Sequence, residues 1–252
     1  MAIKQIYVTH QEGLEVLAPY IVDAIAEVMD SFPSGKRYKE YFPITNLGNW
    51  NGNGNTREPY GSIEWYIERA KRKAIEQGRW QERGQISADQ LYEDLSNDPY
   101  AKKIPQYSIL ITKHDLYGTS GGRLLNFCNG ITKEGHFAIV SKARFIDGNN
   151  HLDIDRFQTV VMHEFGHLIS LTPNGRRNSY EQLGTHCANG DIMAQDMTGT
   201  GIAMTQNRLQ RRMMGLPPIC SDCIEAGCRF LDREIYNFMA RNNLHNLTYN
   251  RN

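Results

Sequence analysis

The sequence predicts a mixed α/β fold, and three observations support that fold class. A strand-like segment and an amphipathic helical segment open the chain, strand-like segments occupy its middle, and a long apolar helical segment follows them. A length of 252 residues is enough to bury a sizeable core without disulfides. That length suits one mixed domain or two small lobes that flank a cleft.

The N-terminal part begins with residues 3–8, IKQIYV, whose apolar and β-branched side chains predict a strand. Residues 14–29 carry apolar side chains at helical spacing and predict an amphipathic helix. From Ser31 to about Ser62 the chain is rich in Gly, Asn and Pro and lacks the Lys-Ser/Thr ending of a phosphate-binding loop. We therefore expect a surface loop or insertion there. Two helices should follow, at residues 63–78 and 87–98.

The middle of the chain contains three strand-like segments enriched in aromatic and β-branched residues. They are YSILIT, LLNFCNG and HFAIVSKARF, at residues 107–112, 124–130 and 136–145. The acidic segment that follows, DGNNHLDID, lacks the spacing and the terminal Glu of a calcium loop. We therefore expect Asp153 or Asp155 to cap the next helix rather than to bind calcium.

Residues 155–171, DRFQTVVMHEFGHLISL, form an apolar helical segment with the strongest functional signal in the chain. His163 and His167 are four residues apart, so a helix places both imidazoles on one face, where both can bind one zinc ion at about 2.0–2.1 Å. Glu164 between them can take a proton from a zinc-bound water and pass it to a leaving amine. One isolated histidine in a core helix would more often satisfy a buried hydrogen bond, but three such residues in register predict a hydrolytic zinc site.

A hydrolytic zinc site usually has three protein ligands and one water, so a third ligand must come from farther along the chain. His186, in LGTHCANGDIM, is the first candidate. Glu181 is the second, because a glutamate on a later helix completes the site in gluzincin-type, thermolysin-like enzymes. Glu181 lacks the Asn that precedes the ligand in that pattern.

Five cysteines are present, and three of them lie within nine residues of one another. Their positions are 128, 187, 220, 223 and 228. An odd number argues against a closed disulfide framework, and without an export signal such a cluster is more typical of a metal site. The alternative for the last four is a set of ordinary buried thiols. Cys128, alone on a strand-like segment, is expected to be a small core residue.

With these residues the chain resembles the metzincin clan of zinc peptidases, and within it the archaemetzincins. The pattern of that family is HExxHxxGxxHC, followed by a Cys, a nearby Met and a distant CxxC. The resemblance covers about residues 105–228. The residues that match are His163, Glu164 and His167 in the first half, His186 and Cys187 in the HC pair, Met193 in the Met-turn, and Cys220 and Cys223 in the CxxC.

The chain departs from that pattern at three places. His186 lies nineteen positions after His167 instead of six, which implies an insertion of thirteen residues. Ser170 replaces the glycine that lets the chain turn sharply out of the helix. Ile192 stands near the place of the second Cys, for which Cys228 could substitute. The resemblance then implies a tetrahedral structural zinc site formed by Cys187, Cys220, Cys223 and Cys228.

The resemblance also implies the architecture: a mixed twisted sheet with backing helices and the catalytic helix in a cleft. Residues 1–171 would form the upper subdomain, and residues 172–252 a smaller lower subdomain that ends in a helix at EIYNFMARNNL. Met193 would lie in a turn beneath the three histidines, although a lone Met could equally fill the core. A peptide substrate would lie extended against an edge strand, for which residues 136–145 are the first candidate.

The implied activity is that of a zinc-dependent endopeptidase with Glu164 as general base and two zinc ions per chain, one catalytic and one structural. Lys plus Arg and Asp plus Glu balance at 28 each, so no global field favours nucleic acid or an anionic membrane. The chain contains no apolar stretch long enough to span a membrane and no signal peptide. We therefore expect a cytoplasmic monomer whose partners are peptide or protein substrates.

A different class of function is a zinc-stabilised, non-catalytic binding module, in which the HExxH metal is structural and the basic segments RAKRK or RLQRR contact a partner. Such a site would need no general base between its histidines and would usually be closed by a fourth protein ligand. The presence of Glu164 therefore favours the peptidase.

Overall fold

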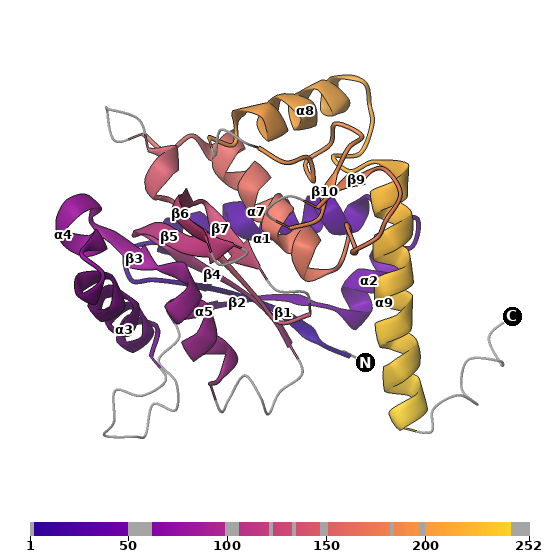
Figure 1. Cartoon of the computed structure of the whole chain (residues 1–252). Helices are drawn as coiled ribbons and strands as arrows, with labels where there is room; N and C mark the ends of the chain where they lie inside the picture. The colour runs from indigo at the N-terminus through magenta and orange to yellow at the C-terminus, as the bar shows by residue number, and fades with distance from the viewer. Residues whose placement is uncertain are drawn as a thin grey trace, which may run out of the picture.

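The computed structural model describes residues 3–49, 62–98, 106–120, 123–132, 135–146, 151–181, 184–196 and 200–242, which form a layered α/β fold (Figure 1). The main sheet has the strand order β2-β1-β4-β8-β7. Neighbouring strands run parallel, except that β7 is antiparallel to β8. The strands are β1 (Gln5–His10), β2 (Ile44–Gly48), β4 (Gln106–Thr112), β7 (Gly130–Thr132) and β8 (Phe137–Ser141).

Helices cover both faces of this sheet because its central strands are apolar on both sides. Ile109 and Ile111 of β4 belong to the core that α1 (Ala18–Asp30) and α7 (Ile154–Leu168) cover. Leu110 between them points to the opposite face, into the core beneath α3 (Ile63–Glu76) and α5 (Ala88–Ser96). Figure 1 shows these two helical layers on either side of the sheet.

A smaller sheet of three strands, in the order β3-β5-β6, extends the layer of α3 and α5. Its buried side chains Ile86 and Leu116 join the same core as Leu110. The short helix α4 (Arg79–Arg83) precedes its first strand. The strands are β3 (Gln85–Ser87), β5 (Asp115–Ser120) and β6 (Arg123–Cys128).

The C-terminal part contains a small hairpin and two helices, and its last helix packs against N-terminal elements. The Phe230 ring lies 6.2 Å, centroid to centroid, from that of Tyr107 on β4. The hydroxyl of Tyr38, on α2 (Gly35–Tyr41), donates to Asp232 at 2.9 Å. The C-terminal elements are β9 (Ser179–Tyr180), β10 (His186–Cys187), α8 (Ile202–Met213) and α9 (Ser221–Arg241).

The helix α7 carries the HExxH segment, and its ends have identifiable causes. Asp153 is the N-cap, because its carboxylate accepts a hydrogen bond from the backbone N–H of Arg156 at 3.1 Å, which confirms the predicted cap. Beyond the last helical residue, Ser170 adopts φ 56°. That left-handed conformation costs a non-glycine residue about 1–2 kcal/mol. The serine thus adopts the turn for which the family pattern uses glycine.

Two sequence expectations were wrong. The segment from Ser31 to Ser62 is not one loop, because it contains α2 and β2, and its Tyr38 and Phe42 are buried in the main core. Tertiary burial there outweighs weak local propensity. The glycine-rich residues of NWNGNGN from position 50 onward lie outside the described residues.

The second wrong expectation concerns the sheet edge. Residues 136–145 contain β8, which lies between β4 and β7, so β7 is the edge strand on this side. Among the helices that the structure describes, none is both long and apolar enough to cross a membrane.

Candidate metal centres

Three histidines from two elements meet at one point beside α7. His163 and His167 lie one turn apart on the helix, and β10 brings His186 to them. The Nε2 atoms of His163 and His167 are 3.1 Å apart, and the ring centroid of His186 lies 5.3 Å from His163 and 5.0 Å from His167. One nitrogen of each ring lies within 4.8 Å of the others. This arrangement fits a single zinc ion held by three imidazoles.

The other ring nitrogen of each histidine is engaged by a neighbouring oxygen. Nδ1 of His163 lies 2.8 Å from the carbonyl of Ile192, and Nδ1 of His186 lies 3.1 Å from that of Gly184. Nδ1 of His167 lies 3.4 Å from the hydroxyl of Thr172. An imidazole that donates from Nδ1 leaves Nε2 available to a metal, so these contacts are those expected of rings that bind one ion through Nε2.

Burial shifts the pKa values of the titratable groups at this centre. It lowers the pKa of His163 to about 4, with a further contribution from His186, and it holds the pKa of His167 well below its usual value. Both imidazoles are therefore neutral at pH 7 and need lose no proton to bind a metal. Burial raises the pKa of Glu164 to about 7, which suits a group that must accept and return a proton.

The edge strand β7 lies directly against Glu164. The hydroxyl of Thr132 donates to Oε2 of that glutamate. Gly130 leaves room for the same side chain, because a Cβ at this position would lie 2.6 Å from the Glu164 Cδ. The general-base candidate is therefore held between the helix and the edge strand, and Thr132 is a functional candidate that the sequence pattern alone did not single out.

Met193 lies beneath the HExxH helix. Its side chain is fully buried, and a Cβ added at Gly166 would approach the Met193 Sδ to 2.2 Å. Gly166 thus allows the thioether to approach the helix between His163 and His167.

Glu181, the alternative third ligand, does not reach the histidines. It is exposed, and its carboxylate accepts a hydrogen bond from the backbone N–H of Gly175 at 3.3 Å. Its neighbour Tyr180 pairs with His186 across the hairpin. Among the residues that the structure describes, no carboxylate or thiol joins the three imidazoles as a further ligand.

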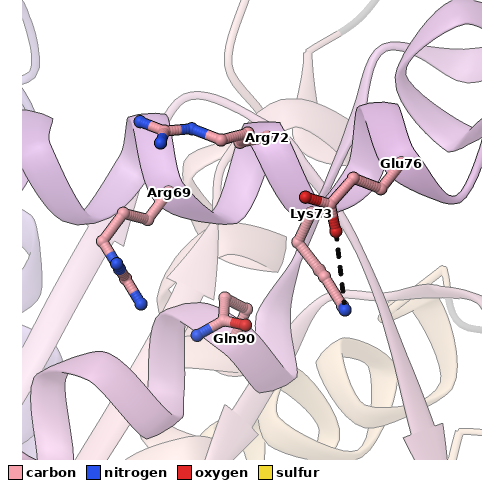
Figure 2. A pocket seen from close by; sticks show the side chains of 5 residues that line it. All are labelled: Arg69, Arg72, Lys73, Glu76 and Gln90. Carbon is pink, nitrogen blue, oxygen red and sulfur yellow. Dashed lines mark ion pairs between the residues drawn. The ribbon is translucent and has the colours of Figure 1, made fainter.

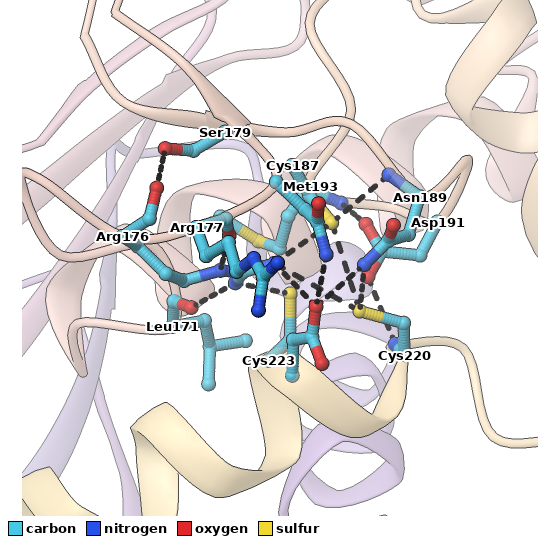
Figure 3. A network of polar contacts seen from close by, with 12 residues as sticks. Leu171, Arg176, Arg177, Ser179, Cys187, Asn189, Asp191, Met193, Cys220 and Cys223 are labelled. Atoms are coloured by element: carbon cyan, nitrogen blue, oxygen red, sulfur yellow. Dashed lines mark hydrogen bonds and ion pairs between the residues drawn. The ribbon is translucent and has the colours of Figure 1, made fainter.

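A second cluster of possible metal ligands adjoins the histidine centre, because its Cys187 directly follows His186 in β10. It is fully buried, and its ligand atoms lie within 4.8 Å of one another. The Sγ atoms of Cys187 and Cys220 are 3.6 Å apart. The cluster, which we call the cysteine cluster, consists of Cys187, Asp191, Cys220 and Cys223 (Figure 3).

The structure does not bring Cys228 to the cysteine cluster. Cys223 and Cys228 are five residues apart on α9, which separates their side chains by about 140° around the helix. Cys228 instead lies beside Tyr38 and Asp232. Asp191 takes part in the cluster although the sequence pattern did not predict it. The available signal was its position directly before Ile192, near the place where the family pattern has a Cys. Cys128, on β6, packs against the core beneath α3 and α5.

The two basic segments are largely engaged within the chain. In RLQRR, Arg208 is buried and pairs with Glu27 at 2.7 Å, and Arg211 donates to the carbonyls of Pro217 and Ile219. In RAKRK, Arg69 pairs with Asp94, and Lys71 and Lys73 lie near Glu68 and Glu76.

A shallow pocket lies between α3 and α5, on the sheet face opposite α7. Figure 2 shows the side chains around it: Arg69, Arg72, Lys73, Glu76 and Gln90. The sheet separates this pocket from the histidine centre.

No protein-family profile matches the chain, and no curated protein matches it in sequence. Solved structures do match. Archaemetzincin from Methanopyrus kandleri is 20% identical over 91% of this chain and 96% of that chain, with a TM-score of 0.56. Two other structures match less closely in shape. Archaemetzincin from Archaeoglobus fulgidus, complexed with malonate, is 14% identical over 88% of this chain and 99% of that chain, with a TM-score of 0.48. A zinc-dependent peptidase from Methanocorpusculum labreanum is 15% identical over 88% of this chain and 99% of that chain, with a TM-score of 0.45. The chain therefore has a fold similar to that of the Methanopyrus kandleri archaemetzincin, as its sequence led us to expect.

Proposed function

We propose that this protein is a zinc-dependent endopeptidase whose catalytic zinc is held by His163, His167 and His186. The observation that carries the proposal is the convergence of three imidazoles, each engaged at Nδ1 by an oxygen, next to a buried glutamate on the same helix. A zinc ion bound there supplies Lewis acidity, which polarises a peptide carbonyl and makes a water a better nucleophile. The similarity of the fold to archaemetzincin supports the same conclusion.

Glu164 is the general base in this proposal. Its pKa of about 7 lets it accept a proton from the attacking water at neutral pH and return it to the leaving amine. The hydroxyl of Thr132 orients the carboxylate by donating to Oε2. No covalent bond between enzyme and substrate is needed, because a water molecule is the nucleophile.

The substrate in this proposal is a peptide bound along β7. This strand ends the main sheet in the described structure and lies against Glu164, so a peptide paired with it would pass the proton acceptor. Backbone pairing with an edge strand binds extended peptides with little dependence on sequence. The position of this edge strand beside Glu164 favours an endopeptidase over a non-catalytic zinc module.

We further propose that the cysteine cluster holds a second, structural zinc ion, giving two ions per chain. Its four ligand groups are buried and leave no position for a substrate, as in closed structural zinc sites. We expect zinc analysis of the purified protein to give two ions per monomer.

Substitution of the general base tests the catalytic proposal. We expect Glu164→Gln to keep both zinc ions while lowering hydrolysis of a peptide library by about 10²–10⁴-fold, because it removes proton transfer and no ligand. Bound zinc and turnover should be measured on the same preparation, with the exposed Glu181→Gln as a matched control that retains activity.

An active Glu164→Gln protein would exclude this glutamate as the base. A zinc-loaded wild type that cleaves no peptide of the library would instead favour the binding module.

A further inference from the structure

The sulfur atoms of the cysteine cluster have the spacing of zinc ligands. Tetrahedral zinc with Zn–S bonds of about 2.3 Å places its sulfurs about 3.8 Å apart. The Sγ atoms of Cys187 and Cys220 are 3.6 Å apart, and that of Cys223 lies within 4.8 Å of both. Cys187 comes from the hairpin, and the other two come from the start of α9, so three corners of a tetrahedron are formed by two separate segments.

Asp191 is a buried carboxylate beside these three sulfurs. Its side chain is fully buried, and among the described residues no Lys, Arg or His forms an ion pair with it. Its two oxygens accept hydrogen bonds from the backbone N–H groups of Met193 and Cys220, each at 2.8 Å. A buried charge is costly unless it is paired or coordinates a metal. A carboxylate oxygen within 4.8 Å of each sulfur therefore fits the fourth corner.

Arg176 brings a positive charge to the same cluster (Figure 3). Its Nη1 donates to the Cys223 Sγ at 3.1 Å and to the Leu171 carbonyl at 2.8 Å, and its Nη2 donates to the Cys187 Sγ at 3.1 Å. Only 6% of its side chain is exposed. Three thiolates and a carboxylate carry more negative charge than one zinc ion neutralises, so a guanidinium that donates to the sulfurs stabilises the loaded site.

We propose that the second zinc site of this chain has three thiolate ligands and one carboxylate ligand, with Asp191 in place of a fourth cysteine and Arg176 as its counter-cation. The inference rests on the structural zinc ion of the proposed function. It accounts for the second Cys that the chain lacks near Ile192, because the neighbouring Asp191 supplies the missing anionic ligand. It also accounts for Arg176, which belongs to the segment inserted after α7.

Zinc-edge X-ray absorption tests the ligand set without changing it. His163→Ala should lose the catalytic zinc and leave the cysteine site alone to contribute to the spectrum. We expect three sulfur neighbours at about 2.3 Å and one oxygen neighbour at about 2.0–2.2 Å. Four sulfur neighbours would overturn the proposal, because they would require Cys228 to move into the site.

Substitution of Asp191 gives an independent measurement. Asp191→Asn should weaken binding of the second zinc by at least about 10-fold, measured by competition with a chromophoric chelator. Asp191→Cys should retain the ion and add a fourth sulfur neighbour, and Cys228→Ser should retain it unchanged. Wild-type zinc affinity in folded Asp191→Asn would overturn the role of the carboxylate. Should Asp191→Asn not fold, the absorption spectrum of the His163→Ala protein still decides.

Arg176 has a matched control in its exposed neighbour Arg177. Arg176→Gln should lower the affinity for the second zinc by about 10–100-fold, as removal of groups that hydrogen-bond to ligands commonly does, whereas Arg177→Gln should not. Equal affinities in the two variants would overturn the counter-cation role. A wild type that holds one zinc while Glu164-dependent hydrolysis persists would exclude the second zinc site and leave the catalytic proposal intact.

Discussion

The histidine centre and the cysteine cluster adjoin each other, since His186 and Cys187 are consecutive, yet they are built in different ways. The histidine centre takes two of its three imidazoles from one helix and has the buried Glu164 and an edge strand beside it. The cysteine cluster takes its four possible ligands from the hairpin, the following turn and the start of α9, and all four residues are buried. Three donors leave a position for chemistry, whereas four buried donors leave none.

One short turn, residues 191–193, contacts both the cysteine cluster and the histidine centre. The carboxylate of Asp191 accepts a hydrogen bond from the backbone N–H of Met193. Ile192 lies between these two residues, and its carbonyl accepts a hydrogen bond from Nδ1 of His163. The turn that carries Asp191 of the cysteine cluster therefore also orients His163 of the histidine centre. A zinc ion in the cysteine cluster would stabilise the fold, while an ion at the histidines would act on substrate.

The largest effects are expected from removing one proposed zinc ligand from each centre in turn. Cys220→Ser should lose one zinc and lower the melting temperature strongly, because zinc bound to thiolates in a small region contributes directly to folding. His186→Ala should lower the affinity of the histidine centre for zinc by at least about 100-fold, so that the other zinc is lost with less damage to the fold. Zinc analysis and thermal melts on both proteins provide the measurement.

Two controls complete that comparison. Cys128→Ser should keep both ions, because this thiol belongs to a different core, and Glu181→Gln should keep the catalytic ion. If Glu181→Gln released the catalytic zinc and His186→Ala did not, the third ligand would be the glutamate of a gluzincin-type site.

A smaller effect concerns the stability of the metal-free protein as a function of pH. The folded-state pKa of Glu164, about 7, lies above the unfolded value of 4.5, so the folded state binds this proton more tightly. The associated stability is fully present below pH 4.5 and is lost as the pH rises through 7. The free energy of unfolding should fall by about 3 kcal/mol over this pH range, and Glu164→Gln should not show this decrease.

Denaturant unfolding of chelator-treated proteins at pH 5 and pH 8 measures this difference. Buried histidines contribute a pH dependence of the opposite sign, because a lowered pKa in the folded state destabilises it as the pH falls. Their contribution is common to both proteins and cancels in the comparison. Parallel stability profiles for wild type and Glu164→Gln would contradict the burial of an ionisable glutamate at the histidine centre.

The smallest expected effect concerns Thr132, which we regard as a positioning residue. Thr132→Val should lower kcat by about 10-fold, because the base loses the hydroxyl that orients it. The hydroxyl also lowers the pKa of Glu164, so its loss should shift the acidic limb of the kcat/KM profile to higher pH. Thr132→Ser should restore both the rate and the profile, and an unshifted profile in Thr132→Val would leave only a structural role.

Local signals in the sequence were enough to predict the helix with His163, Glu164 and His167, because the four-residue spacing and the capping Asp act within one helix. It also indicated the strands of the middle segment and the mixed α/β class. Residues far apart in the sequence were harder to pair: His186 was one of two candidates, and only the hairpin pairing brought it, rather than Glu181, to the other histidines.

The edge strand and the composition of the cysteine cluster depend on how distant segments pack, and the sequence did not predict them correctly. Which strand ends a sheet depends on pairings between distant segments, so β7 could not be recognised from its three residues. Cys228 has the same chemistry as Cys223 but lies on another side of α9, whereas Asp191 reaches the sulfurs because the turn folds back onto the start of that helix. Residue type defines which atoms can bind a metal, but direction in space decides which of them meet, and direction is a property of the packed chain.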